Sequence, residues 1–205
     1  MSPAQLEQLG RESLRDHLLA QAVVAHQKHG PLTAEKLTRE FFRSRYAHQK
    51  PYFELLDGEA VQKSVPTRLH SILQLILAVM LKELGFKSRP ELTLAIDESW
   101  EPTPDVCGVL GPEEDPYPTR AVAVAIEVLS PDDRFTRVIQ KCRKYAEWGI
   151  PDILVYDPVG RDAWYWDAIT GDLIRTKETY RFRSHPVEIS QSEVFRRFDE
   201  ELSRL

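Results

Sequence analysis

The strongest hydrophobic pattern in the chain lies between residues 67 and 84, where apolar residues recur at helical spacing. One stripe consists of Leu69, Ile72, Leu73, Ile76 and Met80. Leu75, Leu77 and Val79 widen this stripe until it covers almost the whole circumference, which is typical of a buried helix. Gly85 follows, and glycine commonly ends helices. The pattern therefore predicts a helix over 67–84 that is buried on nearly all sides.

A second pattern combines two apolar strands with a helix between them. Residues 121–129 are apolar except for Glu127, which is typical of a central strand covered on both faces. Residues 135–148 have helical periodicity and precede Gly149, and residues 152–156 form another apolar run. Because strand–helix–strand units of this length usually cross over, we predict that the two strands are parallel.

Weaker patterns fill the rest of the chain. Asp57-Gly58 permits the tight turn of a hairpin formed by residues 52–56 and 59–62. Residues 91–97 alternate between polar and apolar, like a half-buried strand, and residues 104–110 predict another strand. The other predicted elements are a helix over 3–29, a helix with Thr33 as its N-cap, an edge hairpin at 161–166 and 173–176, and a helix over 192–202.

Composition limits the class of protein. The chain has 205 residues, 42% hydrophobic and 29% charged, so it can bury a core and suits one domain with an appended helix. Cys107 and Cys142 are too few for a disulfide framework or a cysteine-rich zinc site. The apolar run at 72–81 is too short to span a bilayer, and the first residues lack a signal-peptide pattern. We therefore expect a cytoplasmic protein without a membrane partner.

The net charge is −5, which argues against a protein that coats nucleic acid through overall basicity. The charges are nevertheless segregated along the chain. Residues 97–115 contain seven acidic residues and no lysine or arginine, whereas residues 131–150 contain five basic residues against three acidic ones. The basic set could form a phosphate-facing flank or a solvated helix face, and it consists of Arg134, Arg137, Lys141, Arg143 and Lys144.

Glu127 is the first candidate for chemistry, because a charge in a buried strand requires a partner or a metal ion. Asp105 lies in the preceding predicted strand, at a separation that suits adjacent strands. Two strand-borne carboxylates repel each other, and a hard divalent cation such as Mg²⁺ relieves that repulsion. Each acid alone could instead face solvent at the end of a strand or cap the next turn.

Lys141 lies on the helix after Glu127, at the edge of its apolar stripe and beside Tyr145. From this position the lysine could reach back over the end of the sheet, or extend along the surface into solvent. Glu54, in the first hairpin, could be an edge-strand acid that faces water. His70 could be a hydrogen-bonded histidine of the core.

Several segments then occur in a characteristic order. They are Tyr52-Phe-Glu-Leu-Leu-Asp-Gly-Glu, His70 at the start of an apolar helix, Thr103-Pro-Asp-Val, Ile126-Glu-Val-Leu-Ser-Pro, Lys141 with Tyr145, and Gly149-Ile-Pro-Asp-Ile-Leu-Val-Tyr-Asp-Pro. Together, over residues 33–200, they resemble the bacterial Uma-two family, whose fold is restriction-endonuclease-like. The resemblance implies an α/β fold in which helices flank a mixed central β-sheet. Residues 31–205 would form this domain, and residues 1–30 an N-terminal helical extension.

The resemblance also implies a site. Asp105, Glu127 and Lys141 would be catalytic, and the metal ligands would be the two acids with the backbone carbonyl of Val128. Auxiliary residues would be Glu54, His70 and Tyr145, while nucleic acid would contact Arg134, Arg137 and Lys144. In this fold the lysine usually stands two residues after the acid, where this chain has Leu129, and the resemblance suggests that the lysine has migrated to the helix, where Lys141 stands. The Uma-two family also tends to have an acid four residues before the lysine of the helix, Lys141, where this chain has Arg137.

Two functional hypotheses follow. The first is an endonuclease that uses Mg²⁺ or Mn²⁺ to hydrolyse phosphodiester bonds of DNA, with Lys141 orienting or deprotonating the attacking water or stabilising the phosphate. The second, motivated by Leu129 and Arg137, is a catalytically weak or inactive protein of the same fold that binds nucleic acid or protein. A third, weaker interpretation is a partner protein, for example a homodimer, that assembles through its N-terminal helix or its edge hairpin.

Overall fold

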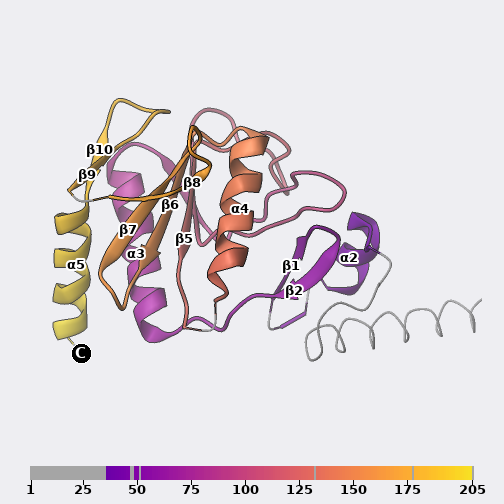
Figure 1. Ribbon diagram of the computed structural model, residues 1–205, viewed down its shortest axis with the longest axis horizontal. Coiled ribbons are helices and arrows are strands. Elements are labelled where there is room, and N and C mark those ends of the chain that lie inside the picture. Colours follow the sequence, from indigo (N-terminus) through magenta and orange to yellow (C-terminus); the bar gives the residue numbers. More distant parts are fainter. Residues whose placement is uncertain (1–35, 47–48, 51, 132, 177, 205) are drawn as a thin grey trace, which may run out of the picture.

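The centre of the molecule is a six-stranded sheet with helices on both faces (Figure 1). The computed structural model describes residues 36–46, 49–50, 52–131, 133–176 and 178–204. The helix expected over 3–29 lies outside these residues, as does Thr33. The helix expected to start after Thr33 begins later, at Arg39, with Thr38 as its N-cap. Within the described part of the chain, no helix is long and apolar enough to cross a membrane.

The sheet is mixed, with the strand order β3-β4-β5-β6-β7-β8. Its strands are Lys87–Pro90 (β3), Val106–Val109 (β4), Val124–Val128 (β5), Asp152–Asp157 (β6), Asp162–Asp167 (β7) and Asp172–Arg175 (β8). β5 and β6 are parallel, and all other neighbours are antiparallel. The predicted parallel pair and the predicted edge hairpin, β7 with β8, are therefore confirmed.

Helices cover the two faces of the sheet (Figure 1). α3 (Arg68–Glu83) and α5 (Gln191–Ser203) pack on one face, and α4 (Phe135–Trp148) packs on the other. Side chains of β5 alternate between these layers, as expected for a strand. Val124, Ile126 and Val128 join the core under α3 and α5, whereas Ala125 joins the core under α4. Glu127 therefore belongs to the α4 face.

α3 confirms the predicted helix but not its predicted burial. The helix begins after Thr67, whose side chain accepts a hydrogen bond from the backbone N–H of His70 at 3.2 Å. The sheet and α5 cover only part of its circumference. Leu75 is 61% exposed and Val79 is 43% exposed, so the prediction of burial on nearly all sides is wrong.

The strand predicted over 91–97 is also wrong, because β3 ends at Pro90 and no strand runs through 91–97. In this segment the backbone N–H of Leu94 donates to the carbonyl of Pro102, and that of Ala95 donates to the carbonyl of Pro118. These partners lie in two different loops rather than in one strand. Proline also has no N–H for a ladder. The alternating apolar residues Leu92, Leu94 and Ile96 pack into the core under α4 without forming a strand.

Smaller elements complete the described fold. The predicted hairpin is confirmed, with Asp57 and Gly58 at φ 52° and 74° in the turn, both in the left-handed region. The smaller elements are α2 (Arg39–Arg45), β1 (Phe53–Leu56), β2 (Glu59–Gln62), β9 (Thr179–Arg181) and β10 (Glu188–Ser190), and β1 and β2 are the two strands of the hairpin. The hairpin is joined to the loop before β4 by reciprocal backbone hydrogen bonds between Leu55 and Glu101.

Candidate active site

The sheet register brings the two predicted carboxylates together. Val106 of β4 is opposite Ile126 of β5, so continuing this register by one residue places Asp105 opposite Glu127. Side chains that are directly opposite on one face of a sheet lie about 5 Å apart at Cβ. Both carboxylates are buried, with Asp105 2% and Glu127 7% exposed. The alternative in which each acid faces solvent is therefore wrong.

Glu127 is held by two side chains of α4. The Nζ of Lys141 lies 2.8 Å from its carboxylate, and the hydroxyl of Tyr145 donates to Oε1 at 2.7 Å. Both groups reach the acid because residues four apart share one face of a helix. Lys141 also lies 2.9 Å from Oε1 of Glu54, which in turn accepts a hydrogen bond from the backbone N–H of Thr103 at 2.6 Å. Three predicted residues thus meet Glu127 directly or through Lys141.

Burial decides between the alternatives for Lys141 and Glu54. Lys141 is 5% exposed and Glu54 is 4% exposed. A lysine that extended along the surface into solvent, or an edge-strand acid that faced water, would be far more accessible. Those two interpretations are wrong, and both residues belong to the buried polar cluster.

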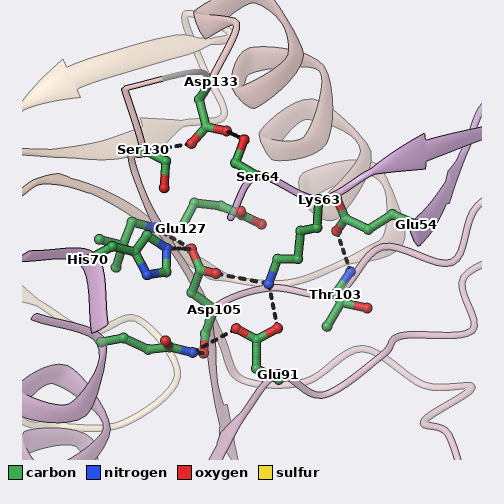
Figure 2. A network of polar contacts seen from close by, with 12 residues as sticks. Glu54, Lys63, Ser64, His70, Glu91, Thr103, Asp105, Glu127, Ser130 and Asp133 are labelled. Carbon is green, nitrogen blue, oxygen red and sulfur yellow. Dashed lines mark hydrogen bonds and ion pairs between the residues drawn. The ribbon is translucent and has the colours of Figure 1, made fainter. Parts of the chain in front are cut away.

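Asp105 has a separate set of partners (Figure 2). Its Oδ1 accepts from Nζ of Lys63 at 2.9 Å, and its Oδ2 accepts from the backbone N–H of Val128 at 2.7 Å. The Nε2 of His70 lies 3.3 Å from the same Oδ2. Lys63 also donates to Glu91 at 2.6 Å. Gln74 donates to Glu91 at 2.8 Å and to the backbone carbonyl of Asp105 at 2.9 Å. The residues of this group that the sequence did not single out are Lys63, Gln74 and Glu91.

Burial and neighbouring charges shift the pKa of the two acids in opposite directions. Burial raises the pKa of Glu127 to about 7, the charge of Lys141 opposes this rise, and Asp105 and Glu54 add to it. Burial also acts to raise the pKa of Asp105, but Lys63 and His70 outweigh it and hold that pKa well below its usual range. Burial acts to lower the pKa of His70, yet the hydrogen bond and charge of Asp105 raise it. The negative charge at Glu127 is therefore only partly compensated.

The donor atoms of this cluster suit a hard divalent cation. Three buried carboxylates face two ammonium groups, and carboxylate oxygens are preferred by Mg²⁺ and Mn²⁺. Among the described residues, no group of three or more His, Cys, Asp or Glu side chains could hold a metal ion. A site made of two carboxylates and a main-chain carbonyl still fits Mg²⁺, because this ion usually keeps several waters. The residues present therefore fit the expected cofactor.

The basic residues of α4 divide between two sides of the helix. Arg137, Lys141 and Lys144 lie three or four residues apart and share one stripe, whereas Arg143 does not, and Arg134 is the N-cap residue that precedes the helix. Lys144 lies 2.6 Å from Asp97 and over the ring of Trp100. Arg134 is exposed and Arg137 is half-buried. Of the three residues expected to bind nucleic acid, Lys144 is thus already engaged within the protein.

Comparisons with known proteins support the fold. The Uma2 family, described as "Putative restriction endonuclease", matches residues 38–200. One similar solved structure, from Anabaena variabilis ATCC 29413, is described as a putative nuclease belonging to DUF820. It has 18% sequence identity and a TM-score of 0.69, and the match covers 79% of this chain and 99% of that chain. No curated protein matches the chain. The predicted α/β fold with a mixed central sheet flanked by helices is confirmed.

Proposed function

Because the chain belongs to the Uma2 family, we propose that it is an endonuclease that hydrolyses phosphodiester bonds of DNA with Mg²⁺ or Mn²⁺ as cofactor. One observation carries the proposal. Asp105 and Glu127 are buried opposite each other at the end of two central strands, and a lysine contacts one of them. A carboxylate pair without full compensation, next to a fixed positive charge, is suited to phosphoryl chemistry.

Each residue has a distinct role in this proposal. Asp105, Glu127 and the carbonyl of Val128 would hold the cation. When bound, the cation neutralises charge on the scissile phosphate and lowers the pKa of a water molecule. Asp105 stays ionised at neutral pH because Lys63 and His70 hold its pKa low.

Lys141 and Tyr145 fix the orientation of Glu127 through contacts of 2.8 and 2.7 Å. Lys141 also brings a positive charge close to the carboxylate pair, where it would stabilise the charge that develops on the phosphate. Glu54 keeps Lys141 in place from the opposite side at 2.9 Å. Arg134, which precedes α4, and Arg137, on the same stripe of α4 as Lys141, would contact neighbouring phosphates of the DNA.

A second candidate function is a binding protein without efficient catalysis. It is favoured by the observation that Lys63 and Lys141 already pair with Asp105 and Glu127 in the protein alone. Such a protein would bind DNA or a protein partner without turnover and would have no carboxylate-dependent Mg²⁺ site.

The deciding experiment measures cleavage of labelled plasmid and linear DNA with Mg²⁺ and with Mn²⁺. We expect the wild type to cleave, Asp105→Asn and Lys141→Met to be inactive, and Glu147→Gln to cleave normally. Glu147 is exposed on α4 and serves as the matched control. Absence of cleavage by the wild type with either ion, or equal cleavage by all variants, would reject the proposed activity. Calorimetric titration with Mg²⁺ then tests the second candidate, because the binding protein would have no Mg²⁺ site that depends on Asp105 and Glu127.

A further inference from the structure

Lys63 places a second lysine at the site, and Figure 2 shows its side chain pointing toward Asp105 and Glu91. It directly follows β2, and its Nζ lies between the carboxylates of Asp105 and Glu91, at 2.9 and 2.6 Å. The side chain of Lys141, by contrast, comes from α4 on the other side of Glu127. Asp105 and Glu127 therefore pair with different lysines, Asp105 with Lys63 and Glu127 with Lys141.

The main chain at Lys63 is fixed on both sides. Its backbone N–H donates to the carbonyl of Tyr52 at 2.8 Å. The hydroxyl of the next residue, Ser64, donates to Asp133 at 2.6 Å, and Asp133 also accepts from the backbone N–H of Ser130 at 2.7 Å. With the backbone held in this way, the long side chain of Lys63 is the part that can change position.

The two lysines differ in how firmly their ammonium groups are held. The side chain of Lys141 is 6% exposed, and both of its carboxylate partners are buried. The side chain of Lys63 is 17% exposed, and one of its partners, Glu91, is 44% exposed. The ion pair with Glu91 is partly exposed and therefore contributes little stability, whereas Asp105, the other partner of Lys63, is only 3% exposed. Of the two lysines, Lys63 is thus the one whose ammonium group is more accessible to an incoming ligand.

Resting on the proposed function, we propose that Lys63 is the resident counterion of Asp105, which a divalent cation displaces and which then contacts the substrate phosphate. Two cations at one carboxylate repel each other, so a cation that binds Asp105 weakens the contact with Lys63. The phosphate brings negative charge to the same place and offers the ammonium group a new partner. Lys63 would thereby couple cation binding to substrate binding, while Lys141 stays in place.

The proposal predicts opposite effects on two measurements. In Lys63→Met, the competing charge at Asp105 is removed, so calorimetric titration with Mg²⁺ alone should give a dissociation constant on the order of tenfold lower. The rate of DNA cleavage should nevertheless fall about 10²-fold, as is usual when one donor to a developing charge is lost. Lys63→Arg retains the charge and should keep the Mg²⁺ affinity of the wild type.

Lys87→Met is the matched control, because Lys87 is half-exposed and pairs with Val109 at the other end of β4. Its Mg²⁺ affinity and cleavage rate should equal those of the wild type. If Lys63→Met does not fold, Lys63→Gln provides a neutral side chain with a polar end. Mg²⁺ affinity that is unchanged or weaker in the neutral variant overturns the role of Lys63. A wild type that neither binds Mg²⁺ nor cleaves DNA overturns the proposed function itself.

Discussion

Replacing Glu127 by glutamine should stabilise the protein relative to the wild type as the pH rises. Burial raises the pKa of Glu127 from an ordinary 4.5 to about 7. The raised pKa therefore adds to the unfolding free energy of the wild type. This stabilisation is complete below about pH 4.5 and is lost as the pH rises through 7. Glutamine is neutral at every pH, like the protonated acid, so the unfolding free energy of Glu127→Gln does not decrease for this reason as the pH rises. The gap between the two pKa values corresponds to about 3 kcal/mol of unfolding free energy.

The assay is urea unfolding followed by tryptophan fluorescence, from about pH 5 to about pH 9, with a chelator present to exclude cations. The difference in unfolding free energy between Glu127→Gln and the wild type should grow by about 2–3 kcal/mol across this range, mostly below pH 8. Glu147→Gln, the same change at an exposed position of α4, should show no such trend. A difference that is independent of pH, or that grows toward acid, would refute the reasoning.

Three further predictions concern single side chains. Lys141→Met should lower the unfolding free energy by about 3–5 kcal/mol in urea, because it leaves two buried carboxylates without their cation, and a loss below about 1 kcal/mol would contradict this. Mg²⁺ at ten times its dissociation constant should stabilise the wild type by about 1.4 kcal/mol but not Asp105→Asn, as measured by thermal unfolding. Asp152→Ala should lower the unfolding free energy by about 3 kcal/mol, since its buried carboxylate accepts hydrogen bonds from Tyr180 and from the backbone at 183–184. Asp152→Ala should leave the Mg²⁺ affinity unchanged. An altered affinity would contradict the independence of the hydrogen bonds of Asp152 from the site around Asp105 and Glu127.

The parts of the site that could be predicted from the sequence are those with a local signal. Glu127 interrupts an apolar run, and a charge in such a position implies a partner, which the structure supplies in Lys141. The position of Lys141 at the edge of a helical stripe indicated the direction of its side chain. Hydrophobic periodicity was likewise sufficient to predict β5, α4 and β6, because the apolar positions of each element are the ones that pack in the core.

The parts that could not be predicted depend on contacts between distant segments. Lys63 follows a short hairpin strand, and nothing near it in the sequence indicates that Asp105 will lie 2.9 Å away. Leu75 and Val79 have the same apolar character as the buried positions of α3, and only the packing of the neighbours leaves them exposed. A pattern of apolar residues therefore predicts that a helix forms, but not how many of its sides are covered.

Leu129 and Arg137, where the chain departs from the pattern it resembles, leave the arrangement of the site intact. Leu129 packs against the core under α4, beyond Glu127 on the same side of the chain, so an apolar side chain fills that place. The positive charge comes instead from Lys141, whose side chain extends from α4 to Glu127 on β5. Its orientation depends on Glu127 and Glu54, both contributed by strands, and not on the residue one turn earlier. A basic residue at 137 therefore leaves Lys141 in place and adds positive charge to the stripe of α4 that we propose contacts DNA.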